Sequence, residues 1–294
     1  MRAGLVYIYP SSFTTAICHH YTSMYTAQPL ENKVTIPYLK KLKARGEKFA
    51  CLTAYDYSFA KLAEKSGVEV ILVGDSLGMV IQGHDTTLPV TLEDIEYHGR
   101  IVQAGLTHSL LMLDMPFGSL NSPQQALDNA TRLIKKTGAQ VVKLEGGDSQ
   151  IKTVEMLSRF SIPCCAHLGL QPQSVNKMGG YRVQGRDEND ANHMIQTALK
   201  IQQAGADLLL LECVPASLAA EITKQLEIPV IGIGAGKHVD SQILVLQDIL
   251  NITEGHKPSF SKNFMAGNNS IQAAIESYVS EVKNQQFPDD SHSF

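Results

Sequence analysis

The chain has 294 residues, of which 44% are hydrophobic and 18% are charged, which supports a folded globular protein and excludes an intrinsically disordered one. The 25 Lys and Arg against 29 Asp and Glu give a net charge of −4, and no basic stripe with interleaved aromatic residues argues for a nucleic-acid partner. No apolar run approaches the roughly 18 residues of a membrane span. The five cysteines lack paired metal-ligand spacing, which indicates packing residues in a reducing compartment.

The first 32 residues differ in composition from the rest of the chain. Glu31 is the first acidic residue, and the apolar stretch Leu5–Tyr9 stops at Pro10, which is too short for a secretory signal peptide. Three interpretations of residues 1–32 remain open. We favour two of them, a disordered extension and a misassigned start with Met24 as the true one. The third is a transit-like segment. No function is assigned there.

The elements predicted along the chain are repeated βα units, because short aliphatic runs alternate with longer amphipathic stretches. An amphipathic helix over Ile36–Arg45 comes first. Eight strands follow, at Phe49–Tyr55, Val68–Gly74, Ser109–Met115, Ala139–Glu145, Ile162–Leu168, Ala206–Cys213, Ile228–Gly234 and Gln242–Leu250, the last of which equally suits the start of a helix. Helices between them include Pro123–Lys136, Asn189–Ala204 and Ser217–Leu226, and a further helix over Ile271–Lys283 follows the last strand.

The number and order of these elements predict a (β/α)₈ TIM barrel. We expect one barrel domain over residues 33–286, with the first and the last helix each capping the barrel or packing against a neighbouring subunit. Residues 287–294 form a polar tail that we expect to be frayed.

Polar residues end several of the predicted strands. In a TIM barrel the reactive groups sit at the carboxyl ends of the strands, because these ends converge on one mouth. One acidic residue at a strand end is more often a helix cap, but several would crowd one cavity, where like charges repel unless a cation or protons relieve them. The residues concerned are Asp75 and Ser76 after the second strand, Asp114 in the third, Lys143 and Glu145 in the fourth, His167 in the fifth and Glu212 in the sixth.

Oxygen ligands without Cys or clustered His favour a hard ion, and Mg²⁺ is typically held by one or two carboxylates and water. We expect Asp75 and Asp114 to be direct ligands. Lys143 and Glu145 are two residues apart and face the same side of a strand. This predicts a metal role for Glu145, directly or through water, and a role for Lys143 at a substrate carboxylate. The alternative is a mutual ion pair of these two residues without a ligand.

Ordered sequence blocks surround these residues. They include Val73-Gly74-Asp75-Ser76-Leu77-Gly78, Asp114-Met115-Pro116-Phe117, Lys143-Leu144-Glu145-Gly146-Gly147, His167-Leu168-Gly169-Leu170 with Pro172-Gln173-Ser174, and Leu211-Glu212-Cys213-Val214-Pro215. With these blocks the chain resembles the ketopantoate hydroxymethyltransferase family from Ile36 to the tail. The residues before Ile36 depart from this pattern and leave targeting open.

The resemblance implies a TIM barrel that binds Mg²⁺ and transfers a hydroxymethyl group from 5,10-methylenetetrahydrofolate to 3-methyl-2-oxobutanoate, which gives ketopantoate for pantothenate biosynthesis. It also implies a cytoplasmic homo-oligomer, typically a decamer in bacteria. The site roles that it implies are metal binding for Asp75, Asp114 and Glu145, substrate binding for Asp75, Ser76, Asp114 and Lys143, and proton abstraction for Glu212.

Our hypothesis for the chemistry is that Mg²⁺ polarises the carbonyl of the 2-oxo acid, and that Glu212, partly desolvated, removes the proton from C3. His167 is a secondary candidate for substrate binding, since a histidine at a strand end is about as often structural. The stretch Gly78–Val90 is long for a βα loop, and we expect it to close over the substrate. The alternative is an ordinary surface loop.

Two other functions compete with this interpretation. A Mg²⁺-dependent lyase or mutase of the phosphoenolpyruvate-handling barrels would use a similar acidic mouth for 2-oxo acids without folate. A non-catalytic scaffold or metabolite sensor ranks lower, because it would have no use for the destabilising polar rim. The run Gly232–Gly236 lacks the third glycine of the dinucleotide fingerprint, and His238 stands where a P-loop needs Ser or Thr, so nucleotide binding is not predicted.

Overall fold

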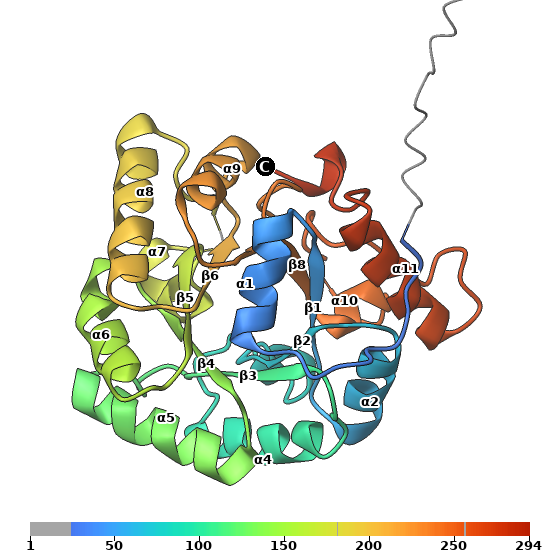
Figure 1. Ribbon diagram of the computed structural model, residues 1–294, viewed down its shortest axis with the longest axis horizontal. Helices are drawn as coiled ribbons and strands as arrows, with labels where there is room; N and C mark the ends of the chain where they lie inside the picture. The colour runs from blue at the N-terminus through green and yellow to red at the C-terminus, as the bar shows by residue number, and fades with distance from the viewer. Residues whose placement is uncertain (1–24, 181, 256) are drawn as a thin grey trace, which may run out of the picture.

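Eight parallel strands close into a barrel in which each strand pairs with its neighbour in chain order and the eighth pairs with the first (Figure 1). The computed structural model describes residues 25–180, 182–255 and 257–294. The strands are β1 (Phe49–Thr53), β2 (Val70–Val73), β3 (Leu110–Asp114), β4 (Val141–Glu145), β5 (Cys164–Gly169), β6 (Leu208–Glu212), β7 (Val230–Ile233) and β8 (Ser241–Leu244). The predicted TIM barrel is therefore confirmed.

Helices between the strands form the outer layer of the barrel (Figure 1). The five predicted helices are all present with ends within one residue of those expected. The helices are α1 (Ile36–Arg45), α2 (Tyr57–Lys65), α3 (Leu77–Val80), α4 (Leu92–Gln103), α5 (Pro123–Thr137), α6 (Ile151–Arg159), α7 (Val175–Met178), α8 (Glu188–Gln203), α9 (Ala216–Gln225), α10 (Leu246–Ile249) and α11 (Ile271–Lys283), with short 3₁₀ turns η1 (Asp148–Gln150), η2 (Pro172–Ser174) and η3 (Asp290–His292).

Local sequence signals explain where the helices begin and end. In α5, the Ser122 side chain accepts a hydrogen bond from the backbone N–H of Gln125, and Pro123 stands at the first helical position, where its missing N–H has no cost. The helix ends at Gly138, whose φ of 81° is a left-handed conformation that suits glycine. These signals made the bounds of α5 readable from the sequence.

The eighth strand is shorter than predicted. It ends at Leu244, and α10 begins at Leu246, so the predicted strand Gln242–Leu250 is wrong in its second half and the helical alternative applies there. The backbone N–H of Leu246 donates to Thr53 Oγ1 on β1 at 3.0 Å, which takes the place of a strand hydrogen bond at this point. Aliphatic residues that suit a buried strand also suit a short buried helix.

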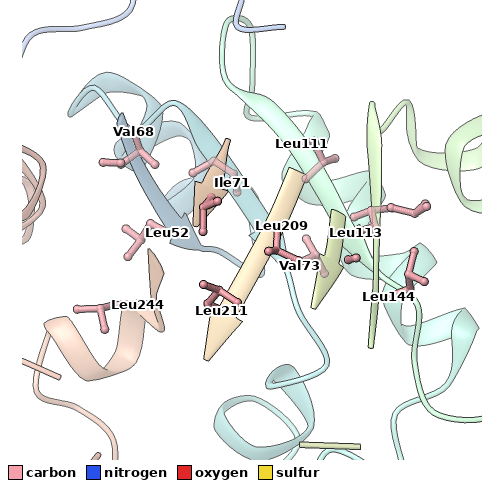
Figure 2. Packing of buried hydrophobic residues seen from close by; sticks show 14 of the residues in the cluster. Leu52, Val68, Ile71, Val73, Leu111, Leu113, Leu144, Leu209, Leu211 and Leu244 are labelled. Carbon is pink, nitrogen blue, oxygen red and sulfur yellow. The ribbon is translucent and has the colours of Figure 1, made fainter. Parts of the chain in front are cut away.

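Alternate residues of the strands pack in two separate layers. Side chains that point into the barrel form one apolar cluster, with Val70, Leu110, Val141, Leu208 and Ile231 among its members. Side chains one position away pack outward against the helices in a larger cluster, part of which Figure 2 shows. This alternation follows from the two-residue period of a strand and decides which side chains can reach the barrel mouth.

Helix α1 closes the end of the barrel where the strands begin. Its buried Leu39 and Leu42 belong to the interior cluster, and in Figure 1 the helix lies across the barrel. Lys43 Nζ contacts Asp240 Oδ2 at 2.7 Å, and the same carboxylate oxygen accepts the backbone N–H of Val230 at the start of β7. The expected capping helix is confirmed, and it leaves the opposite end of the barrel for a site.

The segment before α1 runs beside α11. The backbone N–H groups of Tyr25 and Ala27 donate to Asn284 Oδ1 and Ser280 Oγ, at 2.8 Å and 3.0 Å. Residues 1–24 lie outside the described part of the chain, so the interpretations of residues 1–32 stay predictions. Among the described residues, no helix is long and apolar enough to cross a membrane.

The expectation of a frayed tail is wrong for residues 287–294. Phe287 is 3% exposed and its ring packs against Phe264 and Tyr278, with centroids 5.4 Å and 6.1 Å apart. The carbonyl oxygen of Phe294 accepts the backbone N–H of Ala216 at 2.7 Å, at the start of α9. The polar composition of the tail predicted fraying, but it did not account for the packing of Phe287 and the backbone hydrogen bond of Phe294.

We expect the change Tyr278→Phe to lower the free energy of unfolding by about 1–3 kcal/mol, the usual cost of leaving a buried hydrogen-bonding group without a partner. The fully buried hydroxyl of Tyr278 donates to the carbonyl oxygens of Cys51 on β1 and Gln242 on β8, at the seam that closes the barrel. Urea unfolding measures the effect. Tyr97→Phe, at a side chain that is 55% exposed, is the control and should leave stability unchanged.

Candidate active site

A cavity of about 630 Å³ opens at the carboxyl ends of the strands. Its lining contains every site residue predicted from the sequence, namely Asp75, Ser76, Asp114, Lys143, Glu145, His167 and Glu212. The lining also carries Asp248 and the exposed Arg182. Five carboxyl groups therefore face one lysine, one arginine and one histidine in this cavity.

The register of the strands explains why these side chains meet. Asp114 follows Leu110 and Met112 on the inward side of β3, and Glu212 follows Leu208 and Leu210 on the inward side of β6. Asp114 is paired with Lys143 on the neighbouring β4, and Glu145 is paired with His167 on β5. In β3, β4 and β6, polar groups thus replace apolar residues on the inward side toward the mouth.

Lys143 and Asp114 form a buried ion pair. Lys143 Nζ lies 2.8 Å from each carboxylate oxygen of Asp114, and the two side chains are 5% and 2% exposed. Burial alone would lower the pKa of Lys143, but the charges of Asp114, Glu145 and Asp75 outweigh it and raise this pKa. Lys143 Nζ is 4.0 Å from Glu145 Oε1, so the close partner of the lysine is Asp114 and not the Glu145 of the alternative interpretation.

Asp75 lies directly beside Asp114. The backbone N–H of Asp75 donates to Asp114 Oδ2 at 3.2 Å, and Asp75 Oδ2 accepts from Gln173 Nε2 at 2.8 Å. Burial raises the pKa of Asp75 to about 7, and the negative charge of Asp114 acts in the same direction. The two residues expected to share an ion are therefore neighbours, and their charges repel.

Ser76 lies at the start of α3, next to Asp75. Its Oγ is 2.7 Å from the hydroxyl of Tyr55, which is 2% exposed and follows β1. This contact holds the serine hydroxyl at the cavity wall. Helix α3 and the loop after it also contribute to the wall, because Met79 and Val80 of the helix and Thr87 of the loop line the cavity. Closure of the loop Gly78–Val90 over a substrate stays a prediction.

His167 lies between two carboxyl groups. Its Nε2 is 3.2 Å from Glu212 Oε2, and its Nδ1 is 3.6 Å from Glu145 Oε1, but neither nitrogen has a hydrogen-bond partner within the described residues. Burial, with the nearby charge of Lys143, holds the pKa of His167 well below its usual range. The imidazole is therefore neutral and has one N–H available for a substrate or a carboxyl group.

Glu212 and Glu145 both have raised pKa values. Burial raises the pKa of Glu212 to about 8, although Lys143 opposes the shift, and burial also places the pKa of Glu145 well above its usual range. A glutamate with a pKa near 8 is suited to accept a proton, because its pKa lies close to physiological pH.

The carbonyl group of Glu212 packs closely against the end of β5. Its carbonyl oxygen accepts the N–H of Leu170 at 2.8 Å, and a Cβ atom at Gly169 would lie 2.2 Å from the same oxygen. Gly169 has a φ of +88°, so glycine is required there for space and for conformation. Cys213, the next residue after Glu212, has a φ of +48°, which is a costly conformation for a residue with a side chain.

The acidic cavity fits a divalent cation. Glu145 Oε1 is buried without a hydrogen-bond partner in the described residues, and burial raises the pKa values of Asp75, Glu145 and Glu212, so their charged forms lack solvation that a cation would replace. Within the described ranges, no three His, Cys, Asp or Glu side chains converge on one point as a ready-made metal centre. Two carboxylates and water are enough for Mg²⁺.

Sequence reasoning missed several residues around the cavity. Gln173 donates hydrogen bonds to the acidic cluster, and Arg182, Phe260 and Phe294 line the cavity from loops and from the tail. No spacing rule connects these residues with the strand ends. Of the cysteines, Cys51, Cys164, Cys165 and Cys213 are free and buried, as their interpretation as packing residues predicts.

A closed parallel barrel with a deep acidic cavity at the carboxyl ends of its strands defines a TIM-barrel enzyme. The family model of ketopantoate hydroxymethyltransferase matches residues 33–290. The chain belongs to this family, and it is an enzyme that transfers a hydroxymethyl group in pantothenate synthesis.

Similar proteins support this assignment at high identity. The chain is 56% identical over 273 residues to a 3-methyl-2-oxobutanoate hydroxymethyltransferase of Alkalilimnicola ehrlichii, a match that covers 92% of this chain and 99% of the relative. It is 54% identical over 263 residues to the enzyme of the same name from Shewanella loihica, with 90% and 99% covered.

Solved structures of more distant proteins share the fold. A phosphonopyruvate hydrolase complex with oxalate and Mg²⁺ has a TM-score of 0.55 at 13% identity, covering 72% of this chain and 80% of that chain. A lyase or mutase structure from Burkholderia cenocepacia has a TM-score of 0.57 at 15% identity, covering 88% and 97%. Identity this low supports the barrel alone, so these structures give the lyase or mutase alternative no support beyond the fold.

We expect Glu212→Gln to stabilise the protein above pH 8 in EDTA, by a few degrees in melting temperature. The folded pKa of about 8 exceeds the unfolded value near 4.5, so in this window the native state holds a proton that the unfolded state releases. Stability of the wild type therefore falls as pH rises through the window, whereas the amide does not ionise.

Melting temperatures of both proteins at pH 4.5 and pH 8.5 measure this difference. The advantage of Glu212→Gln should be absent at pH 4.5 and complete at pH 8.5, and an advantage independent of pH would contradict the buried-carboxyl explanation. Glu155→Gln on the exposed side of α6 is the matched control and should show no advantage at either pH.

Proposed function

We propose that the cavity binds 3-methyl-2-oxobutanoate and Mg²⁺, and that the enzyme transfers the hydroxymethyl group from 5,10-methylenetetrahydrofolate to C3 of the 2-oxo acid to give ketopantoate. The observation that carries this proposal is that Lys143 and four carboxyl groups at the strand ends, those of Asp75, Asp114, Glu145 and Glu212, line one cavity, and that Glu212 is not a partner in the Lys143–Asp114 ion pair. The cation that can bind an anionic substrate, Lys143, and the carboxyl group that can accept a proton, Glu212, are thus distinct.

Asp75 and Asp114 would hold the metal, with Glu145 as a further ligand directly or through water. These residues fit because they are adjacent, because their charges repel in the buried cavity, and because Glu145 Oε1 is without a partner in the described part of the chain. When bound, Mg²⁺ supplies Lewis-acid polarisation of the 2-oxo group and relieves the carboxylate repulsion.

Glu212 is the proposed general base. Its carboxylate removes the proton from C3 of the 2-oxo acid. The carbanion at C3 then forms the new C–C bond to the methylene carbon of the donor. Both C–N bonds of the methylene bridge break, water supplies the hydroxyl group, and tetrahydrofolate leaves. A carboxylate with a pKa of about 8 is a stronger base than an exposed glutamate, so burial increases the driving force for proton abstraction. His167, neutral and 3.2 Å from Glu212 Oε2, would orient this carboxyl group or the substrate.

Lys143 and Ser76 are proposed to hold the substrate. The ammonium of Lys143 is the nearest positive charge to the acidic cluster and would bind the carboxylate of the 2-oxo acid while it keeps contact with Asp114. The hydroxyl of Ser76, held by Tyr55, would add a hydrogen bond. Assembly as a homo-oligomer, a decamer by family resemblance, and a cytoplasmic location also remain proposals.

A product assay tests the proposed function. Enzyme with Mg²⁺, 3-methyl-2-oxobutanoate and methylenetetrahydrofolate should form ketopantoate, and EDTA should abolish its formation. Omission of the folate separates the transferase from the lyase or mutase alternative, because only the latter would consume the 2-oxo acid without it. Consumption without folate would reject the proposal.

Exchange of the C3 hydrogen with deuterium tests the role of Glu212. We expect the wild type to catalyse exchange with Mg²⁺ and without folate, at a rate that rises with pH as the base ionises. Glu212→Gln should lose at least about 10²-fold in exchange, the usual contribution of a general base, and should still bind the 2-oxo acid. Exchange at the wild-type rate would exclude Glu212 as the base.

A further inference from the structure

Gln173 connects three strand ends at the cavity. It lies in the 3₁₀ turn η2, in the loop that follows β5. Its side-chain Nε2 donates to Asp75 Oδ2 after β2 at 2.8 Å and to the carbonyl oxygen of Met115 after β3 at 3.1 Å. Its backbone N–H donates to Glu145 Oε2 at the end of β4 at 3.0 Å. One residue thus contacts two carboxyl groups from different strands.

These contacts engage one oxygen of each carboxyl group. Gln173 engages Oε2 of Glu145, whereas Oε1 of the same group is buried without a hydrogen-bond partner among the described residues. On Asp75 it engages Oδ2 with an amide donor, and this bond favours the charged form of the carboxyl group. A carboxylate that is held at one oxygen keeps a fixed orientation for the other.

We propose that Gln173 is a positioning residue for the cation site: its amide fixes the orientation of Asp75, while its backbone N–H leaves Glu145 Oε1 as the oxygen offered to the ion. This inference rests on the proposed function of the cavity as a Mg²⁺ site. It adds a residue outside the barrel strands, so the loop after β5 becomes part of what determines metal affinity.

The bond from Gln173 to Asp75 goes beyond a simpler role, which is to anchor the loop. If Gln173 served only to anchor its loop, the bond from Nε2 to the Met115 carbonyl and the backbone bonds of the turn would suffice. The second donation from the same amide nitrogen, to a buried carboxylate, is a charge-assisted bond whose loss removes an orienting donor from Asp75. The two roles therefore differ in their effect on metal binding.

Titration of the full-length protein with Mn²⁺, followed by electron paramagnetic resonance without substrate or folate, tests the inference. Gln173→Met keeps an unbranched side chain of similar length and removes the amide donor. We expect it to weaken Mn²⁺ binding about 10–100-fold, the usual effect of losing such an orienting partner. Gln171→Met, the same change two residues away, contacts the His167 carbonyl and Ser174 but no carboxyl group, and should bind Mn²⁺ as the wild type does.

Circular dichroism should show that both variants fold. If Gln173→Met does not fold, Gln173→Asn, which keeps the amide on a side chain one methylene shorter, should weaken Mn²⁺ binding in the same direction. Wild-type affinity in a folded Gln173 variant would overturn the inference and leave the proposed function intact. Absence of Mn²⁺ binding in the wild type would overturn both the inference and the proposed function. If Gln173→Met weakens Mn²⁺ binding but the wild type makes no ketopantoate, the inference is supported and the proposed function is rejected.

Discussion

The buried ion pair of Lys143 and Asp114 is the interaction on which the cavity depends. It places one ammonium group against both oxygens of a carboxylate, in a region that also holds Asp75, Glu145 and Glu212. Loss of one partner in a buried pair typically costs about 3–5 kcal/mol, because the other charge is left uncompensated. Burial raises the pKa values of Asp75, Glu145 and Glu212, although the positive charge of Lys143 opposes each shift.

The rest of the barrel places this strained group of charges at one end only. Apolar side chains fill the interior below the charged groups, and α1 seals the opposite end. The apolar interior beneath the charges also excludes water from one side, which is why burial is the largest cause of the pKa shifts at Asp75 and Glu212. The same packing that stabilises the barrel thus makes Glu212 a stronger base.

The fold and the centre of the site were predictable from the sequence because both depend on residue patterns within single strands. Aliphatic runs of five or so residues gave the strands, and a polar residue at an inward position at the end of a run gave Asp114, Lys143, Glu145, His167 and Glu212. What could not be predicted depends on contacts between distant segments. Gln173 reaches Asp75 across 98 residues, and Phe294 reaches the cavity through its bond to Ala216. The eighth strand failed for another reason, since Leu246, Ile249 and Leu250 fit a buried strand and a buried helix equally well.

The inward and outward alternation of the strands has a consequence for how this protein can change over evolutionary time. Lys143 and Glu145 share the interior face of β4 with Val141, while Val142 and Leu144 face the helices. Deletion of a single residue within β4 would exchange the two faces, turning both charges into the helix layer and two aliphatic side chains into the mouth. The strands can therefore accept single substitutions, but we expect insertions and deletions to be tolerated only in the loops, where a change in length does not exchange the two faces.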